Sequence, residues 1–136
     1  MNGEIKRAPV AAVMSDISCY GRAALGVSIA ALSAMGVQCV PLPTSVLSSH
    51  TGGFGRPAKA DLTDFLGPCM RHWAEIGISF DAVCTGYLAN STQADAAVAF
   101  LAMHPQAVKV VAHDRVDHFD RLRMHGQKCN RRVCLR

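Results

Sequence analysis

The sequence predicts a three-layer α/β/α domain built on a mainly parallel sheet. Short apolar runs alternate with segments of helical periodicity, so that strands and helices follow one another as β-α-β-α-β-α-β. Parallel neighbours need a crossover connection, and a helix after each strand supplies it. Half of the 136 residues are hydrophobic, which is enough for one buried core.

The first unit is a strand over Val10–Met14, an apolar run that closes on Ser15 and Asp16. Apolar residues then recur at helical spacing from Leu25 to Met35, and Gly36 ends this helix. The second strand is expected over residues 37–42, ended by Pro43 and Thr44.

The next helix is expected over residues 61–76, where Pro68 indicates a kink or two shorter helices. A third strand is predicted over residues 80–85, followed by the turn "GYLANS". Residues 92–103 form an Ala-rich helix for which Ser91 is the expected cap, and residues 107–112 supply the fourth strand.

Polar and glycine-rich residues follow every predicted strand. They are Ser15 and Asp16, the segment 44–55 with its loop "SSHTGGFG", residues 86–90, and His113-Asp114. Ligands bind beyond the carboxyl ends of the strands in such a sheet. The loop, with two hydroxyls, an imidazole and three glycines, is therefore expected to form one wall of a pocket.

Charge divides the chain in two. Residues 1–120 hold eight Lys or Arg and ten Asp or Glu, whereas residues 121–136 hold six Lys or Arg and no acid. Because residues 1–120 carry no basic stripe, we expect no nucleic-acid partner and interpret 121–136 as a basic tail that is non-native or disordered. The sequence has no apolar run long enough for a membrane helix and no secretory signal, so a cytosolic protein without a membrane partner is expected.

The six cysteines lack the spacing of a disulfide framework, and reduced, packed thiols are expected. The tail leaves open a metal or nucleic-acid module that uses Cys129, Cys134, His113, His118 and His125. Their spacing matches no recognised zinc pattern, so no metal site is predicted.

The stretches "DISCYGRAALGVSIAALSAMGVQCVPLPTSVLSSHTGGFG" and "FDAVCTGYL" resemble the pyridoxal/pyridoxamine kinases of the ribokinase-like superfamily. The shared features are a Tyr-Gly turn, a Ser-x-His-Thr-Gly loop and a Thr-Gly-Tyr segment, and the likeness runs from about Val10 to about Val111. It implies a ribokinase-like, Rossmann-like fold, of which residues 1–120 would be the N-terminal part. It also implies transfer of the γ-phosphoryl group of ATP, with Mg²⁺, to the 5′-hydroxymethyl of pyridoxal, pyridoxamine or pyridoxine. A homodimer is left open.

The resemblance assigns four residues to the substrate pocket. Asp16 stands where many members have a Ser that contacts the pyridine ring, and its carboxylate could accept a hydrogen bond from a protonated nitrogen or a phenol; otherwise it caps a turn. Thr44 lines the ring pocket or forms a strand-end turn. His50 lies near the substrate in a loop that folds over it, or is an ordinary surface residue. Tyr87 packs on the ring or covers the core.

The likeness fails after the fourth strand. Asp114 stands in the family's Asp-Pro-Val-Met/Leu-Gly segment and is the remaining candidate for the nucleotide site. The family's Gly-x-Gly-Asp motif, which holds the catalytic base, is absent, since the Gly-x-Gly at residues 53–55 is followed by Arg56. No catalytic residue is therefore assigned, and the sheet is expected to be incomplete at the C-terminus, with an open edge and an uncovered apolar face.

Two other functions stay open beside a truncated vitamin B6 kinase. One is a non-catalytic protein that keeps the vitamer pocket. The other is a hydroxymethylpyrimidine kinase, which shares the superfamily and acts on a flat nitrogen heterocycle. The Ser-x-His-Thr-Gly loop favours pyridoxal over this second alternative.

Overall fold

Strands and helices alternate along the chain as predicted, with one additional strand. The computed structural model describes residues 7–112. The elements are β1 (Val10–Tyr20), α1 (Ala24–Ala34), β2 (Gln38–Ser49), β3 (Lys59–Asp61), α2 (Thr63–Glu75), β4 (Ala82–Thr85), α3 (Ser91–Met103) and β5 (Val108–Val111). The sequence analysis missed β3, whose three residues are all exposed and show no apolar alternation.

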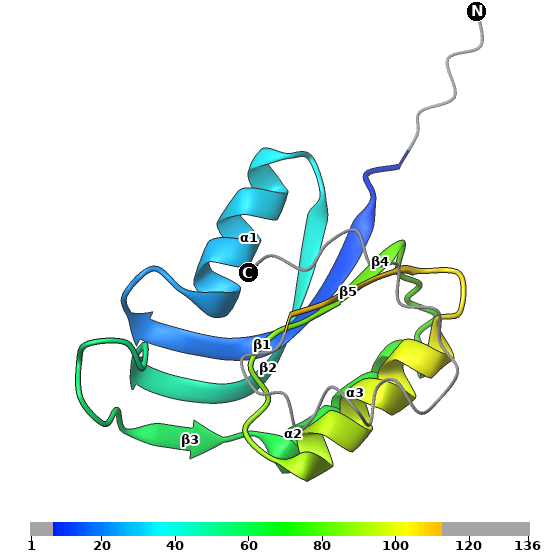
Figure 1. The fold of residues 1–136 in the computed structure, drawn as a ribbon. Coiled ribbons are helices and arrows are strands. Elements are labelled where there is room, and N and C mark those ends of the chain that lie inside the picture. The colour runs from blue at the N-terminus through cyan, green and yellow to red at the C-terminus, as the bar shows by residue number, and fades with distance from the viewer. Residues whose placement is uncertain (1–6, 113–136) are drawn as a thin grey trace, which may run out of the picture.

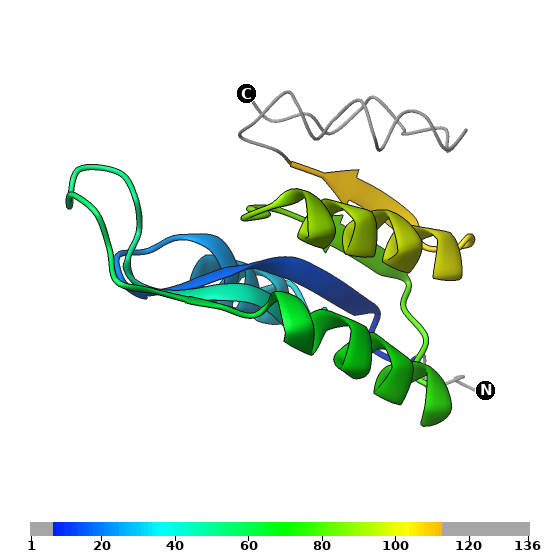
Figure 2. The ribbon, with the colours of Figure 1, turned by 90° about the horizontal axis from the view of Figure 1, so that it is seen from below.

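The described residues form a five-stranded sheet in the order β3-β2-β1-β4-β5, and every pair is parallel except β2 with β3. The connection from β1 to β2 runs one way across the sheet, and the connections from β2 to β4 and from β4 to β5 run the other way. Right-handed crossovers then place α1 on one face and α2 and α3 on the opposite face (Figures 1 and 2). The predicted three-layer arrangement with a mainly parallel sheet is confirmed.

Two strands run further than the sequence predicted. The ends expected at Met14 and Leu42 are wrong, because pairing continues through the polar residues to Tyr20 opposite Ser49. Thr44 consequently lies inside β2, as Asp16 lies inside β1. Pro41 and Pro43 lack a backbone N–H group, which could otherwise be needed for pairing with a neighbouring strand. On the side of β2 away from β1, β3 pairs only with residues 45–47, so the two prolines have no partner strand there and are tolerated.

The helices match the predictions except at two details. The alternative of two short helices around Pro68 is wrong, since α2 continues through this residue. The predicted cap Ser91 is the first residue of α3, and Asn90 is the cap, with its side-chain oxygen accepting a hydrogen bond from the Gln93 N–H at 2.9 Å. Gly36 follows the end of α1 with φ +74°, as its expected role requires.

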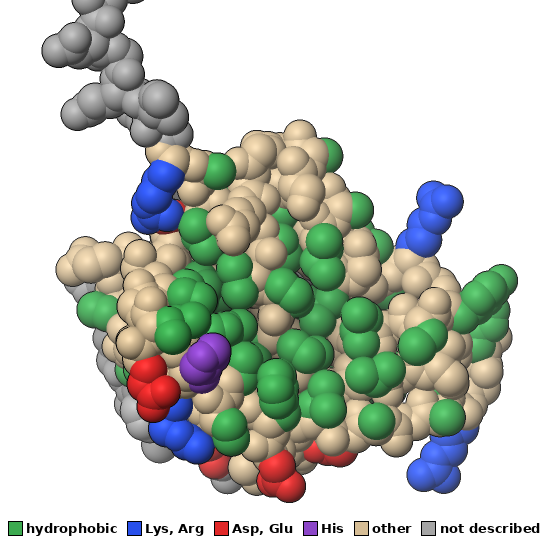
Figure 3. Space-filling view, turned by 180° about the vertical axis from the view of Figure 1, so that it is seen from behind, with side chains coloured by type: hydrophobic (Ala, Val, Ile, Leu, Met, Phe, Trp, Pro, Cys, Tyr) green, Lys and Arg blue, Asp and Glu red, His purple; other side chains and the backbone are tan. Residues whose placement is uncertain are grey.

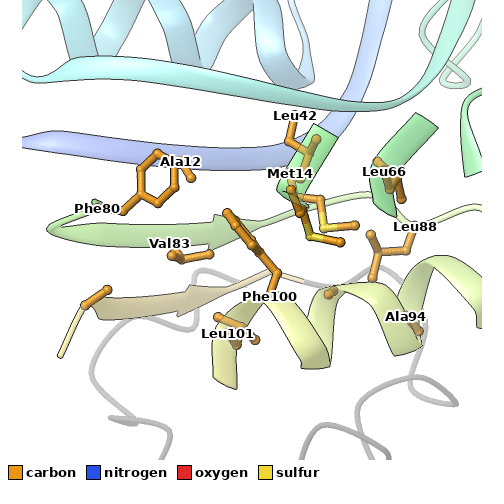
Figure 4. Close-up of a cluster of buried hydrophobic side chains, with 13 residues drawn as sticks. Ala12, Met14, Leu42, Leu66, Phe80, Val83, Leu88, Ala94, Phe100 and Leu101 are labelled. Carbon is orange, nitrogen blue, oxygen red and sulfur yellow. The ribbon is translucent and has the colours of Figure 1, made fainter. Parts of the chain in front are cut away.

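The main core lies between the sheet and the two helices α2 and α3 (Figure 4). Met14, Leu42 and Val83 point into it from three neighbouring strands, and Leu66 and Phe100 close it from the helices. Phe100 is 1% exposed, and its ring lies 5.7 Å from that of Phe80 and 6.1 Å from that of Trp73. Burial of these large rings stabilises the packing of α2 and α3 on this face of the sheet.

The face seen in Figure 3 carries hydrophobic side chains across its middle and charged side chains at its margin. Large hydrophobic side chains that stay exposed include Val27 and Ile29 of α1 and Phe65 of α2. No helix among residues 7–112 is long and apolar enough to cross a membrane.

The four cysteines of the described residues are free thiols, as predicted. Burial raises the pKa of Cys39, Cys69 and Cys84, so these side chains stay protonated and pack as small hydrophobic groups. The basic tail at residues 121–136, with Cys129 and Cys134, lies outside the described residues.

Replacement of the central core ring tests this packing. Phe100→Ala is expected to lower the free energy of unfolding by about 3–5 kcal/mol, because it leaves a cavity beside the rings of Trp73, Phe80 and His104. Met103→Ala, in the same helix at a 47% exposed position, should change it by less than about 1 kcal/mol. Urea unfolding followed by circular dichroism measures both, and equal losses would show that the cluster around Phe100 is not the core.

Candidate functional site

A cavity of about 330 Å³ opens at the carboxyl end of β1. The chain leaves β1 for its neighbour β2 on one side and later returns to β4 on the other, so this is the topological switch point of the sheet, where ligands bind in such folds. The volume is in the range of small-molecule sites. The lining residues are Ser15, Asp16, Ser18, Ala23, Ala24, Leu47, His50, Thr51, Gly86, Tyr87 and Ala112.

An irregularity in the β1–β2 pairing lies at this place. Ser15 is opposite Pro43 and Ile17 is opposite Val46, so two residues of β2 face the single residue Asp16. Such a bulge changes the direction of side chains and is common beside binding sites. It explains how a polar segment is accommodated in a strand that is buried along most of its length.

Asp16 is 6% exposed and lines the cavity. Its carboxylate accepts a hydrogen bond from the Ser18 hydroxyl at 2.9 Å and a longer one from the Ser15 hydroxyl at 3.4 Å. The alternative that Asp16 caps a turn is not what the structure shows, because the residue is inside β1 and its recorded partners are the two hydroxyls.

Thr44 is fully buried and is not among the residues that line the cavity. Its hydroxyl donates to the Tyr87 carbonyl at 3.0 Å, and its own carbonyl accepts from the buried Gln93 amide at 2.9 Å. The strand-end turn suggested as an alternative is wrong because Thr44 lies in the middle of β2. The structure gives Thr44 a supporting place behind the cavity wall.

Tyr87 follows β4 and lines the cavity. Its N–H donates to the Ser15 hydroxyl at 3.2 Å, and its carbonyl accepts from Thr44, so its backbone is held by both neighbouring strands. The Lys59 ammonium lies 5.9 Å from the ring centre. Lys59 is also paired at 3.7 Å with Asp61, whose pKa is lowered chiefly by a hydrogen bond from the Thr63 side chain.

His50 follows β2 directly and lines the cavity. Its Nδ1 accepts a hydrogen bond from the Gly52 N–H at 3.0 Å, so the neutral ring carries its proton on Nε2, where it can be donated to a ligand. Phe54 packs edge-to-face on the imidazole and on Tyr20, with ring centres 4.7 and 5.3 Å apart. The loop therefore folds back on the end of β1.

The turn after β1 is shaped by this imidazole. Gly21 has φ +97°, and a Cβ atom at this position would come within 2.1 Å of His50 Cδ2. Only glycine allows both the left-handed backbone and the close approach of the ring. The histidine and the β1–α1 turn are thus fixed against each other.

The structure brings three of the four predicted substrate residues, Asp16, His50 and Tyr87, to one cavity, and places Thr44 behind it. Asp114 and its neighbour His113 lie outside the described residues. Within residues 7–112, no three His, Cys, Asp or Glu side chains come together in a way that could hold a metal ion.

Sequence reasoning placed Leu47 and Gly86 in the segments expected at the rim but missed Ser18 as a lining residue. Ser18 lies two residues after Asp16, and in a strand such residues are on the same side. Ser18 would therefore have been predicted as a lining residue if the expected strand had been extended beyond Met14. Gly86 is needed because a Cβ there would come within 2.6 Å of the Ser15 hydroxyl oxygen. No local signal in the sequence reports that contact between β1 and β4.

Known structures share this arrangement. A protein of Bacteroides thetaiotaomicron assigned as a phosphomethylpyrimidine kinase, crystallised with pyridoxal, is 36% identical with a TM-score of 0.71; the match covers 79% of this chain and 37% of that one. A second crystal form matches at 29% identity and a TM-score of 0.77, over 90% of this chain and 47% of that one. The fold is ribokinase-like.

Pyridoxal kinase from Lactobacillus plantarum has the same ribokinase-like arrangement, at 30% identity and a TM-score of 0.68, with 78% of this chain and 37% of that one covered. The chain spans less than half the length of each of these three structures. No protein-family profile matches the sequence. No curated protein sequence matches it either. The resemblance to pyridoxal kinases therefore holds at the level of structure.

The contact between Gly21 and His50 can be tested by a pair of glycine variants. Gly53→Ala, at φ +85° with open space around it, is expected to cost only the backbone strain, about 1–2 kcal/mol. Gly21→Ala should cost about 1–3 kcal/mol more, because the new methyl group collides with the imidazole. Thermal unfolding in combination with His50→Ala measures the coupling.

In the double variant Gly21→Ala/His50→Ala the extra cost of the methyl group should disappear, so that relative to His50→Ala alone the loss equals that seen for Gly53→Ala. If the losses from Gly21→Ala and His50→Ala simply add, the imidazole does not lie against this turn.

Proposed function

We propose that this chain binds a vitamin B6 vitamer in the cavity at the end of β1, as the substrate-binding part of an ATP-dependent kinase that phosphorylates the 5′-hydroxymethyl group. The observation that carries the proposal is the convergence of Asp16, His50 and Tyr87 on one small cavity at the switch point. The 36% identical Bacteroides protein, crystallised with pyridoxal, supports the choice of ligand.

The cavity suits a flat, polar ring. Tyr87 offers an aromatic surface for stacking and Leu47 adds an apolar wall. The His50 Nε2–H can donate to the phenolic oxygen of the vitamer, and the Asp16 carboxylate can accept from a donor elsewhere on it. A few placed polar groups in an otherwise apolar pocket fix the orientation of such a ligand.

ATP and Mg²⁺ enter the proposal only through the kinase neighbours. When bound, they would supply the phosphoryl group and neutralise its charge. The Gly-x-Gly-Asp motif of the kinase family does not occur in the 136-residue sequence, and the role proposed for residues 7–112 is to bind and orient the acceptor. A cytosolic role in pyridoxal 5′-phosphate salvage and a homodimer belong to the same proposal.

Hydroxymethylpyrimidine is the second candidate ligand. The Bacteroides protein is assigned as a phosphomethylpyrimidine kinase although its crystals contain pyridoxal. The amino group of the pyrimidine could also donate to Asp16. Direct competition between the two ligands decides between these functions.

Ligand-dependent stabilisation tests the proposal. Pyridoxine and pyridoxal at saturating concentration are expected to raise the melting temperature of the chain, because a ligand that binds only the folded state stabilises it. At a ligand concentration of a hundred times Kd, the free energy of unfolding rises by about 2.7 kcal/mol. Pyridoxine lacks the aldehyde, so its effect excludes Schiff bases with lysines. Hydroxymethylpyrimidine should give a smaller shift.

Variants of Tyr87 locate the binding. Tyr87→Ala should weaken vitamer binding about tenfold through loss of stacking, whereas Tyr87→Phe keeps the ring and should bind as the parent does. Absence of any vitamer shift would reject the proposal, and a larger shift with hydroxymethylpyrimidine would favour the alternative. Formation of pyridoxal 5′-phosphate from ATP at an ordinary enzymic rate would contradict the restriction to substrate binding.

A further inference from the structure

The Asp16 carboxylate is an unusual group for the inside of a cavity. Only 6% of its surface is exposed. The ion pairs among residues 7–112 are those of Arg7 with Asp81 and of Lys59 with Asp61. Asp16 thus has no Lys or Arg partner in the described part of the chain. A buried carboxylate without a cation is costly, and proteins retain such a group where a ligand or function compensates for it.

The recorded hydrogen bonds leave part of this carboxylate unused. Ser18 donates to Oδ2 at 2.9 Å and Ser15 to Oδ1 at 3.4 Å, while a carboxylate offers about four acceptor positions. The Ser15 hydroxyl also accepts from the Tyr87 N–H at 3.2 Å, so its single proton is directed to Asp16. The two serines hold the carboxylate in place and leave acceptor capacity for a group in the cavity.

No other described residue around the cavity competes for that group. Asp16 is the single carboxylate in the lining, and none of the described lining residues is a Lys or an Arg. His50 presents a donor and Tyr87 a ring, which leaves Asp16 as the place where a positive charge on the ligand is stabilised.

We propose that Asp16 makes this cavity selective for ligands that carry an ammonium group on a ring substituent. Ligands with an aminomethyl group should bind more tightly than those with a hydroxymethyl group at the same position, and these more tightly than those with an aldehyde. This inference rests on the vitamer-binding function proposed above. An ammonium gives a charge-assisted hydrogen bond to the carboxylate, a hydroxyl gives a neutral one, and an aldehyde oxygen has no proton to donate. Pyridoxamine is therefore the preferred vitamer.

Calorimetric titration of the 136-residue chain at pH 7 with pyridoxamine, pyridoxine and pyridoxal tests this order. Pyridoxamine is expected to bind about tenfold more tightly than pyridoxine, the difference typical of a hydrogen bond to a charged group. Asp16→Asn should remove this preference while pyridoxine binding changes little. Asp64→Asn, which removes the same charge from an exposed position in α2, should keep the parent order.

Equal affinity of the parent chain for the three vitamers would overturn the inference, and this comparison needs no variant to fold. A loss of equal size for all three in Asp16→Asn would also overturn it, because the carboxylate would then bind the ring nitrogen. If no vitamer binds the parent chain, the proposed function itself fails, which is distinguishable from binding without preference.

Discussion

Two hydrogen bonds to the backbone of Tyr87 hold the site together. The Thr44 hydroxyl donates to its carbonyl and its N–H donates to the Ser15 hydroxyl, so the end of β4 is tied to β2 and to β1. The fully buried Gln93 extends the tie, because its amide donates to the Thr44 carbonyl and its oxygen accepts from the Ala89 N–H. Side chains from three strands can therefore meet at one cavity with little freedom to move apart.

The same region shows how the fold makes room for polar groups. A bulge in the β1–β2 pairing places two residues of β2 opposite Asp16, and two serines take up part of the capacity of its carboxylate. A core built only for stability would hold apolar groups at this point, as β1 does at Ala12 and Met14. These polar residues lie at the switch point of the sheet, which is the place where ligands bind in folds of this kind.

The periodicity of the sequence was sufficient for the order of the elements and for the layers. Apolar runs and Gly36 located β1, α1 and β2 because burial and backbone conformation there are local properties. The strand ends could not be predicted, since Ser15, Asp16 and Thr44 are polar and their inclusion depends on pairing with distant residues. The exposed strand β3 lacked any pattern, and the cap at Asn90 competed with an equally suitable Ser91.

For the site, the sequence was enough to predict which residues lie near the ends of the strands, but not the role that each of them has. Asp16, His50 and Tyr87 were singled out by sequence and share the cavity, but Thr44 turned out to support Tyr87 from behind. That distinction depends on which way a side chain points at a bulge, and the bulge has no signature in either strand alone. The contact of Gly21 with His50 is likewise visible only in three dimensions.

The central claim is that the end of β1 is a vitamer site, and backbone amide NMR of the chain titrated with pyridoxamine tests it most directly. The expected result is a set of chemical-shift changes centred on Gly52, Gly86 and Tyr87, whose N–H groups bond to the cavity-lining residue His50, to Met14 and to the cavity-lining residue Ser15, respectively. Changes confined to other surfaces, such as the exposed side of α3, or no changes at saturating ligand, would contradict it.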